Sequence, residues 1–238
     1  IYNAPTPEHL RWGTWPTDDE GVTVHALLDF VHIQLLPKLK SLTGGGDKIA
    51  GLIRMIFDDA NNYMKNGTLM RQVINKINGI DFNASDDRHL FGDIYEKLLK
   101  DLQSAGNAGE FYTPRAVTQF IVDMVNPRLG DVVLDPATGT GGFLVCAWEW
   151  LISKEVSGGV FDRSDYFIRK KVFHGQDLVP RPRRLALMNL FLHGVEPHIY
   201  LGDTIYEPDA GERYDVVLTN PPFGTKGANQ APDRDDFT

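Results

Sequence analysis

The sequence predicts an α/β protein: a mostly helical N-terminal region, residues 1–103, precedes a domain built on a parallel sheet, residues 104–238. Two observations predict this class. In the second half, four short apolar runs alternate with helix-like segments, which is typical of parallel strands joined by right-handed crossovers. In the first half, apolar residues instead recur at helical spacing. The chemistry is therefore expected in the second half.

The first half is predicted to supply packed helices. Residues 1–22 are rich in proline and glycine and are expected to form an irregular loop. Thr68 has the residue type of an N-cap and is expected to begin the third helix. The four expected helices cover residues 23–40, 47–64 and 68–78, and a last stretch that starts at Asp86 or Asp87 and runs to about residue 102.

A well-defined helix is expected at the start of the second half. Residues 104–109 are small and polar, and we expect a loop there between the two regions. Thr113 followed by Pro114 predicts a cap and a first-turn proline, and the helix is expected to continue to Asn126-Pro127. On its own this segment favours a structural role over a functional one.

The four expected strands of the second half each lead to a polar residue. They cover residues 132–134, 171–177, 198–203 and 214–219, and the polar residues are Asp135, Asp177, Asp203 and Asn220. Ligands of open parallel sheets bind outside the carboxyl ends of the strands, so these four side chains are expected to share one site. In a doubly wound strand order the first and fourth strands are neighbours.

The segment Asp135–Phe143 predicts a strand, a tight glycine-rich turn and a helix that presents backbone amides to a ligand. A phosphate-binding Walker loop would need Lys and then Ser or Thr where Phe143 stands. A dinucleotide fingerprint would need its third glycine three residues after the second, but Gly142 directly follows Gly141. A cationic nucleoside ligand remains, and S-adenosylmethionine carries an ammonium and a sulfonium. An ordinary glycine-rich connection is the structural alternative.

The segment Asn220–Phe223 indicates what this site could do. Two consecutive prolines make the turn stiff and remove its backbone donors, so it offers carbonyl oxygens and the Asn220 side chain as acceptors. A planar group bearing an amine could donate to these acceptors and stack on Phe223. A sulfonium methyl beside that amine would complete a methyl transfer. The alternative is a proline turn that only ends a strand.

The composition limits the partners. The formal net charge of −8 is unlike that of a domain that grips DNA unaided, so another chain is expected to supply much of any DNA binding. The one cysteine, Cys146, lies in an apolar run and is expected to be buried and inert, which favours a reducing cytoplasm. The histidines lack metal-ligand spacing, so no metal is expected. No apolar run reaches the ~20 residues of a membrane span.

Asp135–Phe143 together with Asn220–Phe223 resembles the motifs of the methyltransferases that act on N6 of adenine in DNA. Glu110–Arg115, placed before them and after a helical segment, resembles the modification subunit of prokaryotic type I restriction-modification systems. The resemblance implies a Rossmann-like S-adenosylmethionine-dependent methyltransferase sheet, here incomplete at its C-terminus, and a site-specific adenine DNA methyltransferase activity.

The resemblance also implies roles for individual residues. Asp177 would bind the ribose hydroxyls of the cofactor, Asp203 would lie near its adenine, and Asp135 would lie near its methionine part. The turn Asn220, Pro221, Pro222 and Phe223 would bind and activate a target adenine flipped out of the duplex. The residues that would hold the methionine part are Glu110, Phe111, Tyr112, Thr113, Pro114, Arg115, Thr140, Gly141 and Gly142.

The partners implied by the resemblance are double-stranded DNA, a DNA-specificity subunit, a restriction subunit and a second copy of the modification subunit. Two other functions stay open. A protein glutamine N5-methyltransferase would use the same turn, but Tyr in place of Phe223 and no segment like Glu110–Arg115 would be expected there. A non-catalytic assembly subunit that only binds the cofactor is the second alternative.

Overall fold

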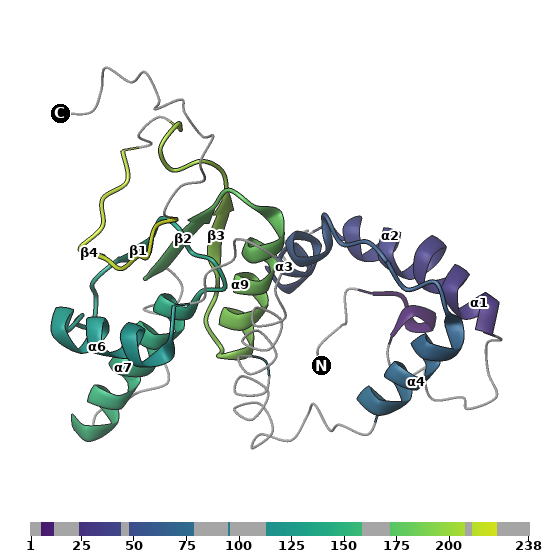
Figure 1. Ribbon diagram of the computed structural model, residues 1–238, viewed down its shortest axis with the longest axis horizontal. Helices are drawn as coiled ribbons and strands as arrows, with labels where there is room; N and C mark the ends of the chain where they lie inside the picture. Colours follow the sequence, from purple (N-terminus) through teal and green to yellow (C-terminus); the bar gives the residue numbers. More distant parts are fainter. Residues whose placement is uncertain are drawn as a thin grey trace. The chain divides into compact units, whose positions relative to one another are not determined.

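The computed structural model describes residues 6–11, 24–43, 48–78, 95, 113–158, 172–207 and 211–222 (Figure 1). The chain falls into two compact units, residues 1–87 and 88–238. The predicted boundary after residue 103 lies outside the described residues and stays a prediction. The same holds for the helix expected between Asp86 and residue 102, apart from Tyr95.

The first unit is helical throughout its described part, as predicted. Leu27 of α1 (Val24–Asp29) packs on Met70 and Ile74 of α4 (Gly67–Asn78), and the three residues form a buried core cluster. The stretch 24–40 is one continuous helical segment, because the backbone stays helical at Asp29 and Leu36 on either side of its π-helical middle. The elements are η1 (Glu8–Leu10), α1 (Val24–Asp29), η2 (Phe30–Leu35), α2 (Leu36–Lys40), α3 (Lys48–Phe57) and α4 (Gly67–Asn78).

Two predicted helix boundaries in this unit are wrong. α3 ends at Phe57 rather than at Met64, because Asp and Asn side chains follow that compete with helical hydrogen bonds: the Met64 N–H donates to Asn62 Oδ1. α4 begins one residue before Thr68, and the cap is Asn66. Its Oδ1 accepts hydrogen bonds from the N–H groups of Thr68 and Leu69, at 2.9 and 3.2 Å.

The second unit contains the predicted parallel sheet. Its strands are β1 (Val133–Asp135), β2 (Phe173–Asp177), β3 (His198–Leu201) and β4 (Val216–Val217), in the order β3-β2-β1-β4 with every neighbouring pair parallel. Leu134 lies opposite both His174 and Val217. The predicted adjacency of the first and fourth strands is therefore confirmed.

The described helices of this unit lie on one face of the sheet (Figure 1). α7 (Gly142–Gly158) packs on β1 and β2, α9 (Pro180–Leu192) packs on β2 and β3, and the two helices touch. α6 (Arg115–Val125) packs on α7. Both crossovers put their helix on the same face because right-handed connections that progress in one direction along the sheet must do so. The main buried side chains are Val122, Val133, Leu144, Val145, Phe173, Leu187, Leu190 and Ile199.

The helix ends in the second unit refine the predictions. α6 starts at Arg115, so Pro114 precedes its first turn and Thr113 lies two residues before it, whereas Thr113 was expected as the cap. The extended backbone of Pro114, with ψ at 139°, prevents the helix from starting earlier. α9 begins at Pro180, so Pro182 lies in its first turn, and Gly194 follows its C-terminal end with φ at 75°.

Cys146 is fully buried in α7 as a free thiol, as expected. Its Sγ donates to Gln119 Oε1 at 3.3 Å, and burial raises the pKa of the thiol. Among the described residues, no helix is long and apolar enough to cross a membrane, and no group of His, Cys, Asp or Glu side chains could hold a metal ion.

Candidate functional site

The glycine-rich turn after β1 is held by hydrogen bonds to the neighbouring strand. The Thr138 hydroxyl lies 2.8 Å from the Asp135 carbonyl and 3.1 Å from the Gln176 carbonyl, and the Thr138 N–H donates to that same Gln176 oxygen. Gly139 and Gly141 have φ of 55° and 81°, which only glycine adopts readily. The turn can therefore bring its backbone close to a ligand without side chains in the way.

The turn also needs small residues beneath it. A Cβ at Gly175 in β2 would lie 2.3 Å from Thr138 Oγ1 and 2.8 Å from the Ile199 side chain. A Cβ at Gly141 would meet Ala186 of α9 at 3.4 Å. In addition, Asn189 of α9 is almost fully buried and its Nδ2 donates to the Thr140 carbonyl at 3.0 Å. The glycine-rich turn thus packs closely against β2 and α9.

Asp177, at the carboxyl end of β2, is joined to this turn. Its Oδ2 accepts a hydrogen bond from the Gly139 N–H at 2.8 Å, and its Oδ1 accepts one from the Val179 N–H at 2.8 Å. The first contact links strand ends 38 residues apart in sequence. The structure therefore places Asp177 in contact with the glycine-rich turn.

Asp203 follows β3 and lies in the next loop along the same edge. Its Oδ1 accepts hydrogen bonds from the N–H groups of Ile205 and Tyr206, at 2.9 and 3.3 Å. Within the described part of the chain, its Oδ2 receives no protein donor. The Thr204 hydroxyl donates to the Pro136 carbonyl at 2.7 Å, which ties this loop to the turn after β1.

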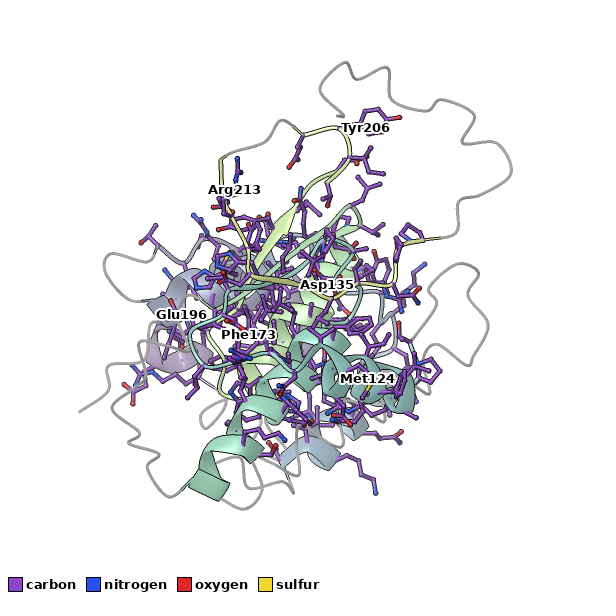
Figure 2. All side chains as sticks on the ribbon, turned by 90° about the vertical axis from the view of Figure 1, so that its left-hand side faces the viewer. Met124, Asp135, Phe173, Glu196, Tyr206 and Arg213 are labelled. Atoms are coloured by element: carbon purple, nitrogen blue, oxygen red, sulfur yellow. The ribbon has the colours of Figure 1, made fainter. Side chains whose placement is uncertain are left out.

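Asp135 lies in the interior of the unit, whereas Tyr206 and Arg213 lie at its outer edge (Figure 2). Only 1% of Asp135 is exposed, and burial raises the pKa of its carboxyl to about 7. The nearby Asp177 charge acts in the same direction. The Thr219 hydroxyl and the Ala137 N–H lower the pKa but do not outweigh burial. The Thr219 hydroxyl is itself buried without a well-formed hydrogen bond, so we attribute the shift mainly to desolvation.

Asn220 follows β4 and is brought to the same edge by the pairing of β4 with β1. The Leu218 N–H donates to the Leu134 carbonyl at 2.9 Å, so the chain segments leading to Asn220 and Asp135 run side by side. The Asn220 side chain donates from Nδ2 to Thr113 Oγ1 at 3.1 Å. Pro221 and Pro222 are exposed. The predicted motifs Glu110–Arg115 and Asn220–Phe223 are therefore in contact through Thr113 and Asn220.

Arg115 has a different partner from Thr113, which contacts Asn220. Its guanidinium forms an ion pair with Glu149 of α7, and the other carboxylate oxygen of Glu149 lies 3.9 Å from Nε2 of His193. The pair joins the start of α6 to α7. In this structure Arg115 contributes to fixing Thr113 and Pro114 in place.

Glu110, Phe111, Tyr112 and Phe223 lie outside the described residues, so their predicted roles stay predictions. Sequence reasoning missed Thr138, Gly175 and Asn189, which hold the turn. The type and spacing of Gly175 and Asn189, one inside a strand and one inside a helix, did not signal these contacts. Thr138 stood inside the motif, but small polar residues are common in glycine-rich turns.

Comparison with known proteins supports the same family. The family model described as N-6 DNA Methylase matches residues 86–238. The EcoEI methylase subunit of a type I restriction enzyme from Escherichia coli is 47% identical over 229 residues, which cover 94% of this chain and 46% of that relative. The StySPI methylase subunit from Salmonella potsdam is 34% identical over 191 residues, covering 73% of this chain and 35% of that relative.

Solved structures agree. A chain from a type I R-M system, in a structure concerned with complex assembly, is 40% identical with a TM-score of 0.76, covering 92% of this chain and 44% of that one. A type I restriction-modification methyltransferase subunit from Streptococcus thermophilus is 25% identical with a TM-score of 0.58, covering 84% and 44%. The predicted methyltransferase fold class is thereby confirmed, and the chain spans less than half the length of each of these relatives. The chain belongs to the N-6 DNA methylase family, and its predicted resemblance to the modification subunits of type I restriction-modification systems is confirmed.

Proposed function

We propose that the full-length protein transfers a methyl group from S-adenosylmethionine to N6 of an adenine in DNA, as the modification subunit of a type I restriction-modification complex. One observation carries the proposal: β1 and β4 are neighbours, so the glycine-rich turn and the Asn-Pro-Pro turn leave the sheet side by side. A methyl donor held by the first turn meets an amine held by the second.

The residues around the first turn suit the cofactor. Among the described residues, and apart from chain neighbours and the helix's own backbone, no atom lies within 4 Å of a Cβ built at Gly142, which leaves room for a ligand at the N-terminus of α7. Asp135 would attract the ammonium of the methionine part, and Asp177 would accept from the ribose hydroxyls. The Oδ2 of Asp203, which accepts no hydrogen bond from the described residues, suits the amine of the cofactor adenine. The segment from Glu110 to Arg115, with Thr140, would complete the methionine subsite.

The cofactor supplies an electrophilic methyl group on its sulfonium. The chain's own task is to hold the acceptor amine: Oδ1 of Asn220 and the Pro221 carbonyl accept its two hydrogens, while Pro222 keeps the turn stiff and Phe223 stacks on the base. With its hydrogens engaged in this way, the amine directs its lone pair at the methyl group. As the N–C bond forms, the bond between the methyl carbon and the sulfonium sulfur would break and leave a neutral thioether. The proton would then leave the cationic nitrogen, so no strong base is required.

DNA recognition is proposed to come from other subunits. The net charge of −8 supplies no general attraction for phosphates, which fits a protein that is brought to DNA by a specificity subunit. A restriction subunit and a second copy of this subunit would complete the assembly, and a prokaryotic cytoplasm is its proposed location. The helical region, residues 1–103, would then serve assembly rather than chemistry.

The test uses the full-length protein purified with its partner subunits, radiolabelled S-adenosylmethionine and two acceptors: unmethylated genomic DNA and total cell protein. We expect label in DNA, recovered as N6-methyladenine after digestion to nucleosides. Label in protein alone would support the glutamine methyltransferase instead. Cofactor binding without label in either acceptor would support the non-catalytic assembly subunit. Both of these results overturn the proposal.

A further inference from the structure

Thr113 and Asn220 are 107 residues apart in sequence and are joined by a hydrogen bond of 3.1 Å from Asn220 Nδ2 to Thr113 Oγ1. Thr113 belongs to the segment proposed to hold the cofactor, and Asn220 belongs to the turn proposed to hold the target adenine. Both side chains are half-buried. The bond therefore connects the two halves of the proposed site directly.

The hydrogen bond to Thr113 determines the orientation of the Asn220 amide. A carboxamide carries a donor group and an acceptor on the same trigonal carbon, and only the acceptor, Oδ1, can receive a hydrogen from an amine. Rotation about the last torsion of Asn is soft, so an unrestrained amide samples many orientations. When the Thr113 hydroxyl accepts from Nδ2, Oδ1 must point in a different direction, away from Thr113.

Thr113 is a suitable anchor because its own backbone is held in place. The next residue, Pro114, has φ of −55° and ψ of 139°, and its carbonyl accepts hydrogen bonds from the N–H groups of Val117 and Thr118 in the first turn of α6. The residue after that, Arg115, is paired with Glu149 of α7. Thr113 thus lies at the start of a helix that is fixed to the rest of the unit.

We propose that Thr113 is a positioning residue for the acceptor: its hydroxyl orients the Asn220 amide so that Oδ1 faces the target amine. The inference rests on the proposed methyl transfer. It gives Thr113, a residue of the segment proposed to hold the cofactor, a second role in orienting the residue that binds the target adenine. The hydroxyl acts through Asn220 and touches no reacting atom. Its loss is expected to slow the chemical step more than it weakens cofactor binding.

The experiment compares Thr113→Val, which removes the hydroxyl at nearly constant shape, with Thr113→Ser, which retains it. Thr118→Val is the matched control, because the Thr118 hydroxyl donates to the Arg115 carbonyl of the same helix at 2.9 Å and does not contact Asn220. Each variant of the full-length protein is purified with its partner subunits. Methyl transfer to unmethylated genomic DNA gives kcat and KM, and calorimetry gives the affinity for S-adenosylmethionine.

We expect Thr113→Val to lower kcat by about tenfold, as for the loss of one hydrogen bond to a reacting assembly. The dissociation constant for the cofactor should rise by a smaller factor than kcat falls, Thr113→Ser should restore most of kcat, and Thr118→Val should match wild type. In an Asn220→Ala background, Thr113→Val should cause no further loss, since it acts through Asn220.

Three results would overturn the inference: wild-type kcat in Thr113→Val, a weaker cofactor affinity at unchanged kcat, or equal losses in Thr113→Val and Thr118→Val. The first excludes a role in the chemical step, the second makes Thr113 a cofactor contact only, and the third makes its role structural. If wild type itself transfers no methyl group to DNA, the proposed function fails instead, and the two failures are thereby told apart.

Discussion

The Asp177 carboxylate bridges two segments of the proposed cofactor site: one oxygen lies 2.8 Å from the Gly139 nitrogen and the other 2.8 Å from the Val179 nitrogen. Both contacts need an acceptor, and the two donors are on different oxygens. A carboxylate satisfies both, but a carboxamide would direct its NH₂ group at one of the two N–H donors. The carboxylate of Asp177 therefore has a structural role in the turn.

We predict that Asp177→Asn weakens S-adenosylmethionine binding by about tenfold or more, because the partly buried Gly139 N–H loses its acceptor and the turn loses this link to the end of β2. Titration calorimetry on the full-length protein measures this. Asp131→Asn is the matched control: the Asp131 carboxylate accepts a single hydrogen bond, from the Arg128 N–H, and an amide oxygen can replace it. Equal affinity in the two variants would contradict the prediction.

The pKa of Asp135, about 7, predicts a pH-dependent cofactor affinity. A cationic ligand beside this carboxyl requires the ionised form. Affinity should therefore fall as the pH decreases below about 7 and level off above about 8. Binding near neutral pH should release protons, which calorimetry in buffers of different ionisation enthalpy detects. In Asp135→Asn, the affinity should be lower and should no longer follow this pH profile.

The same group affects stability with a defined sign. The ordinary pKa of 3.8 applies to the unfolded chain, and the folded value is about 7, so the folded state binds more protons between these limits. The contribution of Asp135 to the free energy of unfolding thus decreases as the pH rises from about 4 to about 7. Asp135→Asn should gain stability relative to wild type between pH 5 and pH 8 in thermal melts. A constant difference would contradict the pKa shift.

Gly175→Ala is predicted to destabilise the second unit by about 1 to 3 kcal/mol, because the new methyl group would overlap Thr138, whose hydroxyl is committed to hydrogen bonds. Gly142→Ala is the control for stability, since its Cβ would meet no atom within 4 Å. Chemical denaturation of the full-length protein measures both. A Gly175→Ala variant as stable as the control would show that the packing under the turn can relax.

Asn220→Ala is predicted to lower the rate of methyl transfer much more than the affinity for S-adenosylmethionine. The side chain contacts Thr113 and lies in the turn proposed for the acceptor, so its loss should lower kcat by about 100-fold or more. Affinity for S-adenosylmethionine should stay within about threefold of wild type. Calorimetry and methyl transfer to DNA measure the two effects. Parallel losses of affinity and rate would place Asn220 in the cofactor half instead.

The sheet and its functional edge were predictable because they depend on local patterns. Short apolar runs that end in Asp135, Asp177, Asp203 and Asn220 define strands, and the rule for parallel crossovers places their ends together. Helix ends were less predictable: Asn66 rather than Thr68 caps α4, since adjacent residues of similar type compete for the same donors. A sequence pattern does not distinguish well between two neighbouring residues that could each cap the same helix.

The sequence by itself thus determined the fold class, the order of the motifs and the kind of ligand they suit, because periodicity, turn chemistry and residue type act over a few residues. Only the tertiary structure decided which of these residues touch. Three such contacts join residues 34 to 107 positions apart. They are the hydrogen bond between Asn220 and Thr113, the packing of Thr138 against Gly175, and the ion pair of Arg115 with Glu149. Such contacts depend on how helices and strands pack in three dimensions, which no local pattern records.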